Sequence, residues 1–142
     1  MEKIRNQEAS DPIAVFDSGL GGISVVKKLT KMLPHENIVY FGDSINAPYG
    51  TKSIDELLSL CDKNIRLLLD MNAKCVVIAC NTATSAAAAY LREKYPFLPI
   101  IGMEPAVKPA SKIAERPKVL VLATPVTING GKLKELIHCF DD

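Results

Sequence analysis

Residues 74–90, KCVVIACNTATSAAAAY, constrain the fold of this chain more than any other stretch. Cys75 to Ala79 is a short apolar run rich in β-branched residues, which predicts a strand buried on both faces. The run ends at three small polar residues, Cys80-Asn81-Thr82, and an alanine-rich helical segment follows directly. A fully buried strand that leads straight into a helix is typical of α/β proteins with a parallel sheet.

Cys80 therefore stands at the carboxyl end of a predicted strand and at the amino end of a predicted helix. Helix N-termini carry partial positive charge and unpaired N–H groups, and both favour a thiolate over a thiol. A cysteine placed in this way can act as a nucleophile or as a base. The alternative is a buried structural cysteine, and the local pattern leaves both interpretations open.

Further strands are predicted along the chain, each separated from the next by a helical segment. Short apolar runs mark four of them, at residues 13–16, 37–41, 98–101 and 119–122. Strands that alternate with helices form βαβ units, so we expect a parallel, flavodoxin-like α/β sheet.

The helices between these strands differ in how strongly the sequence predicts them. Ser53 and Glu56 have the spacing of a capping box, and apolar residues recur at helical spacing from there to about Met71. An earlier helix of about eleven residues is expected to end at Pro34. We expect its inner face to be Ile23, Val26, Thr30 and Leu33. A helix after Pro105 and a weak one over 131–140 complete the prediction.

Small polar and acidic residues collect where the predicted strands end. In chain order they are Asp17 and Ser18; Asp43 and Ser44; Cys80, Asn81 and Thr82; Glu104; and Thr124 and Thr127, in a polar turn. In open α/β sheets, ligands bind beyond the carboxyl ends of the strands. The sequence therefore predicts one binding site to which most strands contribute.

The glycine-rich turn Gly19-Leu20-Gly21-Gly22 raises a second hypothesis, a small-ligand or nucleotide-binding module without catalytic activity. Asp43 stands about where an acid that binds ribose would lie. The spacing, however, is G-x-G-G, and Ser24 occupies the position of the third glycine of a dinucleotide fingerprint. We expect instead that the glycines expose backbone N–H groups that hold a small carboxylate, which leaves Asp17 to meet an amine or a proton.

Composition and charge exclude several classes of function. The formal net charge of +1 gives no electrostatic reason to expect nucleic acid or an anionic membrane as a partner. No apolar run approaches the roughly 20 residues of a membrane span. The first eleven residues are polar, so we expect a disordered tail and not a signal peptide. The 4 cysteines include no CxxC pair, and with 2 histidines a metal site is not expected. A reducing cytoplasm fits this cysteine usage.

Four motifs together carry a resemblance to a known family. They are DSGLGG at 17–22, YFGDSINAPYG at 40–50, ACNTATS at 79–85 and GMEPA at 102–106. In this order they closely resemble the glutamate racemases of the aspartate/glutamate racemase superfamily, over about residues 12–128. The resemblance implies interconversion of L- and D-glutamate without a cofactor, supplying D-glutamate for peptidoglycan. It also implies glutamate as the partner, and a homodimer is a further expectation.

The resemblance also implies roles for individual residues. The family uses two cysteines on opposite faces of the substrate Cα, one as thiolate base and one as thiol acid. Cys80 matches the first cysteine, and Asp17 matches the family's catalytic acid. Further matches fall on the residues that bind substrate: Asp17, Ser18, Pro48, Tyr49, Gly50, Asn81, Thr82 and Thr124, with Glu104 and Thr127 as additional candidates.

The family's second cysteine lies in a GCTHYP-like motif that this sequence does not contain. Cys139 stands in IHCFDD, without the Thr-His context, so the second role is not transferred to it. We expect residues 12–102 to form the first α/β domain, lacking the segment that completes it in the family. Residues 103–142 are expected to be the opening part of a second, similar domain. The sequence is thus interpreted as a truncated racemase.

Overall fold

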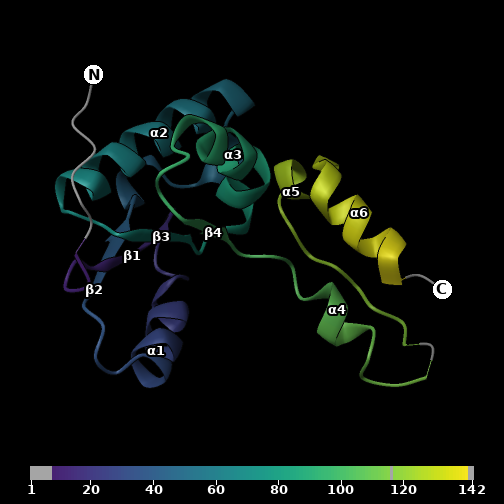
Figure 1. The fold of residues 1–142 in the computed structure, drawn as a ribbon. Coiled ribbons are helices and arrows are strands. Elements are labelled where there is room, and N and C mark those ends of the chain that lie inside the picture. Colours follow the sequence, from purple (N-terminus) through teal and green to yellow (C-terminus); the bar gives the residue numbers. More distant parts are fainter. Residues whose placement is uncertain (1–7, 116, 141–142) are drawn as a thin grey trace.

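The computed structural model describes residues 8–115 and 117–140 and places a four-stranded sheet at the centre of the molecule (Figure 1). The strands are β1 (Ile13–Asp17), β2 (Ile38–Gly42), β3 (Cys75–Ile78) and β4 (Ile100–Gly102). They lie in the order β2-β1-β3-β4, and all neighbours are parallel. The expected parallel α/β fold is confirmed. These four strands follow the flavodoxin-like order.

The strand order places a topological switch point between β1 and β3. The chain passes from β1 to β2 on one side and then crosses back to β3 on the other. Crevices that bind ligands open at such a point, beyond the carboxyl ends of the two strands. Phe16 pairs with Ile78 in this register, so the residues that follow β1 and β3 begin beside each other.

Helices cover both faces of the sheet. Figure 1 shows α2 (Ile54–Asp70) and α3 (Asn81–Lys94) on one face and α1 (Ile23–Met32) alone on the other. The core lies under α2 and α3, where apolar side chains of both helices bury against β1 and β3. Its fully buried members include Phe16, Leu57, Ile65, Ile78 and Leu91.

Both ends of α2 are fixed by local hydrogen bonds. Ser53 Oγ accepts the Glu56 amide, and the Glu56 carboxylate accepts the Ser53 amide, which is the predicted capping box. At the other end Asn72 adopts φ 62°, and the Ala73 amide donates to the Leu68 carbonyl. This Schellman-type end turns the chain directly into β3.

The predicted inner face of α1 is largely wrong. Ile23 and Leu33 are 41% and 39% exposed, and Thr30 is also exposed, whereas Val26 is half-buried as expected. Val25 and Leu29 are the other half-buried apolar positions. Within the described residues α1 is the one helix on its face of the sheet, so its flanks are not covered by another helix there (Figure 1).

The strand predicted at residues 119–122 does not form. This segment is extended but pairs with no strand in the described part of the chain, and Leu120 and Leu122 are 84% and 86% exposed. A run of apolar residues becomes a strand only where a neighbour satisfies its backbone groups. Beyond β4 the structure instead contains three helices, α4 (Val107–Ala110), α5 (Pro125–Asn129) and α6 (Gly131–Phe140). The weakly predicted final helix is thus present, and the expected polar turn begins a short helix.

The tail expected at residues 1–11 lies mostly outside the described residues. Residues 8–11 depart from that expectation because they are bound to the domain. Asn37 Nδ2 donates to the Ser10 carbonyl over 2.9 Å, and the Lys74 ammonium donates to the Ala9 carbonyl. Asp11 is buried.

Candidate active site

Cys80 lies where the sequence predicts it, between β3 and α3. It is the N-cap residue of α3, and its sulfur accepts the Ala83 amide at 3.4 Å. The thiol is 8% exposed, and its Sγ lies 3.3 Å from Ser18 Oγ. The first turn of α3 and the Ser18 hydroxyl therefore both contact one sulfur atom, and groups of these two kinds can donate hydrogen bonds to a thiolate.

Strand pairing explains why Ser18 and Cys80 meet. The Ala79 amide donates to the Phe16 carbonyl over 2.8 Å, which extends the β1–β3 ladder to the last residue before Cys80. Ser18 follows β1 by one residue, and Cys80 follows β3 by two. The contact between their side chains thus forms at the switch point of the sheet.

Asp17 also lies at this strand end, but its carboxylate is occupied. It is 6% exposed, and its Oδ2 accepts the amides of Gly19 and Gly22 at 3.3 and 3.1 Å. The expectation that these glycine N–H groups hold a substrate carboxylate is therefore wrong for both of them. A Cβ on Gly22 would lie 2.9 Å from Asp17 Cβ, so the turn can close on the carboxylate only with glycine there.

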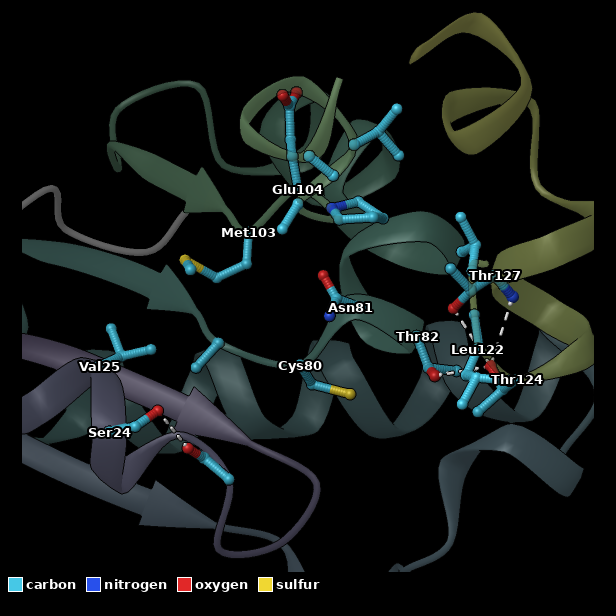
Figure 2. A pocket seen from close by; sticks show the side chains of 18 of the residues that line it. Ser24, Val25, Cys80, Asn81, Thr82, Met103, Glu104, Leu122, Thr124 and Thr127 are labelled. Atoms are coloured by element: carbon cyan, nitrogen blue, oxygen red, sulfur yellow. Dashed lines mark hydrogen bonds between the residues drawn. The ribbon is translucent and has the colours of Figure 1, made fainter. Parts of the chain in front are cut away.

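Three threonines form a hydroxyl cluster beside Cys80. Thr82, in the first turn of α3, shares a hydrogen bond of 2.9 Å with Thr124, and Thr124 shares one of 3.1 Å with Thr127. Thr124 is the N-cap residue of α5 and accepts the Thr127 amide at 3.4 Å. The cluster thus joins the start of α3 to the start of α5, as the labelled side chains in Figure 2 show.

The loop at residues 48–50 contributes differently from the expectation. Tyr49 is 2% exposed and donates its hydroxyl to Asp43 Oδ2 over 2.6 Å, so this hydroxyl faces the protein interior. Gly50 packs against Thr124, where a Cβ would lie 2.6 Å from Thr124 Cγ2. Pro48 is exposed. The nucleotide hypothesis loses support here, because Asp43, the acid that it assigns to ribose, is buried and already accepts hydrogen bonds from Tyr49 and Asn46.

Glu104 follows β4 and lies at the margin of the site. Its carboxylate is 53% exposed and forms an ion pair of 3.2 Å with Lys132 of α6. The pair connects the segment after β4 to the last helix of the described chain. In Figure 2 the Glu104 carboxylate points away from Cys80.

A cavity of about 730 Å³ lies in front of these side chains. Seven of the predicted site residues line it: Asp17, Cys80, Asn81, Thr82, Glu104, Thr124 and Thr127. Four others do not: Ser18, Pro48, Tyr49 and Gly50. Sequence analysis missed part of the lining, namely Val25, Met103 and residues 119–123. Their apolar character resembles that of core residues and gives no signal of a site.

The charge of the cavity lining is distinctive. Among the described residues, the lining contains two carboxylates, those of Asp17 and Glu104, and no lysine, arginine or histidine. Neutral donors in the described part of the chain, namely the threonine hydroxyls and the Asn81 amide, are thus the groups available to an anion. A ligand that carries both an amine and a carboxylate finds partners for both in this lining.

Two buried residues behind Cys80 have shifted proton affinities. Burial raises the pKa of the Cys61 thiol to about 12, with further contributions from Cys80 and Asp43. Burial and the hydrogen bond to Asp43 raise the pKa of the Tyr49 hydroxyl. Both groups therefore stay protonated at neutral pH.

Across residues 8–115 and 117–140, no three His, Cys, Asp or Glu side chains are grouped so that they could hold a metal ion. None of the helices in these two stretches is long and apolar enough to cross a membrane.

The sequence matches the Asp/Glu/Hydantoin racemase family over residues 13–140. The chain belongs to this family. The racemase match extends through both the sheet and the three helices that follow it. It includes every residue of the candidate site.

Individual relatives agree with this assignment. A curated glutamate racemase from Clostridium acetobutylicum is 52% identical over 132 residues, which are 93% of this chain and 52% of that protein. One from Clostridium perfringens is 55% identical over 131 residues, covering 92% and 50%. The chain spans about half the length of the curated relatives it matches.

Solved racemase structures share the fold. A glutamate racemase isoform from Bacillus anthracis superposes with a TM-score of 0.81 at 34% identity, over 94% of this chain and 50% of that one. The Escherichia coli glutamate racemase, in complex with L-glutamate and the activator UDP-MurNAc-ala, gives a TM-score of 0.81 at 34% identity. That match covers 91% of this chain and 49% of the other.

Proposed function

We propose that this protein acts as a glutamate racemase in which Cys80 transfers the α-proton of the substrate. The observation that carries the proposal is the placement of the Cys80 sulfur, on the cavity and within 3.3 Å of Ser18 Oγ at the start of α3. The curated relatives from Clostridium acetobutylicum and Clostridium perfringens are both named glutamate racemase, which supports glutamate as the substrate.

The lining supports an amino-acid substrate on chemical grounds. Removing an α-proton leaves negative charge spread over Cα and the carboxylate, and nearby hydrogen-bond donors lower the energy of that state. Thr82, Thr124 and Asn81 offer such donors beside Cys80. The negative charges of Asp17 and Glu104 on the lining attract the ammonium, although Asp17 Oδ2 already accepts two glycine amides and Glu104 pairs with Lys132. The site thus offers a thiolate for the α-proton, neutral donors for the carboxylate and negative charge for the ammonium of an amino acid.

Inversion needs a second proton donor on the opposite face of Cα. Within the described residues, Cys80 is the only cysteine that lines the cavity, while Cys61 and Cys75 lie outside the lining and Cys139 is exposed on α6. The proposal for the described residues is therefore the half-reaction at Cys80, the reversible removal of the α-proton.

The family carries finer expectations, which we adopt as part of the proposal. D-glutamate made by the enzyme supplies peptidoglycan synthesis in the cytoplasm, and the protein works as a homodimer. Glutamate is the ligand of the site, and the reaction proceeds on the protein's own side chains. The racemase relatives support the reaction class. The neutral hydrogen-bond donors of the lining, namely the threonine hydroxyls and the Asn81 amide, can bind the carboxylates of an acidic amino acid.

Deuterium incorporation tests the proposal. The chain is incubated in deuterated water with L-glutamate, D-glutamate or L-aspartate, while proton NMR follows the α-proton and circular dichroism follows inversion. We expect exchange with glutamate, with or without inversion. Absence of both signals, together with tight binding of NAD or ATP in calorimetry, would favour the alternative of a non-catalytic nucleotide-binding module.

A further inference from the structure

Asn64 is a polar residue buried in the apolar face of α2. It is 4% exposed and follows Cys61 by one helical turn, with Ile65 and Leu68 as further buried residues of the same helix. An unpaired amide at such a position would cost more free energy than a hydrophobic residue of similar size. Asn64 is paired: its Nδ2 donates to Tyr49 Oη over 3.0 Å and lies 3.4 Å from Asp43 Oδ2.

These contacts complete a closed polar network. Tyr49 Oη donates to Asp43 Oδ2 over 2.6 Å, and Asp43 Oδ1 accepts Asn46 Nδ2 at 2.8 Å. The Asp43 amide donates to the Asp17 carbonyl over 2.9 Å, which attaches the network to the end of β1. Because Asp43, Tyr49 and Asn64 are 3%, 2% and 4% exposed, water does not compete for their hydrogen bonds.

The network fixes the backbone that follows Tyr49. Gly50 packs so closely on Thr124 that a Cβ would lie 2.6 Å from Thr124 Cγ2. Thr124 in turn shares its hydroxyl hydrogen bond of 2.9 Å with Thr82. A displacement of the Tyr49 ring would therefore move Gly50, then Thr124, and then the donor beside Cys80.

We propose that Asn64 is a positioning residue of the site, which holds Tyr49 through its hydroxyl and so sets the place of Thr124 against Thr82. The assignment of glutamate as the ligand rests on the proposed function, but the positioning of the 49–52 segment does not. Asn64 touches none of the lining residues by a hydrogen bond in the described structure; it acts through Tyr49 and Asp43. Asn64 lies among the buried apolar residues of α2, so helical spacing in the sequence does not indicate its role, whereas its hydrogen bonds to Tyr49 and Asp43 do.

A double-mutant cycle on the 142-residue chain tests this role. Asn64→Leu removes the amide at similar volume, Tyr49→Phe removes the hydroxyl, and the third variant combines them. Leu68→Ala is the matched control, because Leu68 is a fully buried residue of α2 outside the network. Amide hydrogen exchange at Lys52 and Thr127, whose N–H groups bond to Tyr49 O and Thr124 Oγ1, reports the segment. Calorimetry with L-glutamate reports the site.

We expect each single variant to raise exchange at Lys52 and Thr127 and to weaken glutamate binding about threefold to tenfold, which is part of the free energy of the two buried hydrogen bonds that each variant removes. The effect of the double variant should be smaller than the sum of the two single effects, because the Asn64–Tyr49 hydrogen bond is lost in both, while each substitution also removes its own hydrogen bond to Asp43. Leu68→Ala should lower the melting temperature without a selective change at these two amides. Additive effects in the double variant, or unchanged local exchange in Asn64→Leu, would overturn the proposal. A wild-type chain that fails to bind glutamate would count against the proposed function, while the exchange cycle would still decide the role of Asn64.

Discussion

Ser18 Oγ lies 3.3 Å from Cys80 Sγ although 62 positions separate the two residues in the sequence. Parallel pairing of β1 and β3 produces this contact, since both residues leave the sheet at the same edge. The serine hydroxyl and the Ala83 amide are thus the two polar groups on the sulfur in the described structure. A thiolate at Cys80 would receive hydrogen bonds from both.

Ser18→Ala should make Cys80 less reactive. The variant removes one donor from the thiolate, and hydrogen bonds to charged groups contribute about 1.5–3 kcal/mol, so alkylation of Cys80 by iodoacetamide at pH 7 should slow by about tenfold. Mass spectrometry of the labelled peptide measures the rate. Ser44→Ala changes an exposed serine that follows β2 and should leave it unchanged. Equal rates in all three proteins would show that Ser18 does not stabilise the thiolate.

Gly50→Ala should displace Thr124. The new Cβ would lie 2.6 Å from Thr124 Cγ2 and 2.8 Å from Thr124 Cβ, so either the 49–51 loop or α5 has to move. Overpacking of this kind costs about 1–3 kcal/mol, which a chemical denaturation curve detects, and glutamate binding should weaken with it. Gly19→Ala is the control, because a Cβ there meets nothing within 4 Å. Unaltered stability and binding in Gly50→Ala would contradict the close contact.

Raising the pH above 9 should destabilise the fold through Cys61. Its pKa is raised from 9.0 to about 12, so the unfolded chain loses this proton first as the pH rises. The stabilisation is therefore fully present below pH 9 and is lost between pH 9 and about 12. Urea unfolding across this range should show that Cys61→Ala loses less stability with pH than the wild type. Cys139→Ala, at an exposed thiol, should follow the wild-type profile. Parallel profiles for Cys61→Ala and wild type would contradict the assignment.

The sequence predicts the sheet well because local signals are strong there. Cys75–Ile78 forms the expected buried strand, and the capping box at Ser53 begins α2 where predicted. The same reasoning fails at 119–122, where the apolar run is present but a pairing strand is not among the described residues. Strand formation there depends on a partner, which a local pattern does not contain.

The sequence predicts which residues belong to the candidate site better than it predicts the contacts that these residues form. Cys80, Thr82 and Thr124 come together as their places after strands or before helices suggest. The hydrogen bonds of Asp17 to its own glycine turn, and those of Asn64 to Tyr49, depend on tertiary packing. Both polar groups are satisfied inside the protein, a condition that periodicity alone does not reveal.

Cys80→Ser tests the central claim most directly. Serine keeps the small N-cap side chain of α3, so the melting temperature should change little, but its hydroxyl is far less acidic than a thiol and is a poor base at neutral pH. The measurement is the rate of α-deuterium incorporation into L-glutamate, compared among wild type, Cys80→Ser and Cys139→Ser. We predict exchange in the wild type and in Cys139→Ser and its loss, by at least about 100-fold, in Cys80→Ser. Undiminished exchange in a folded Cys80→Ser protein would contradict the role of Cys80 as the base.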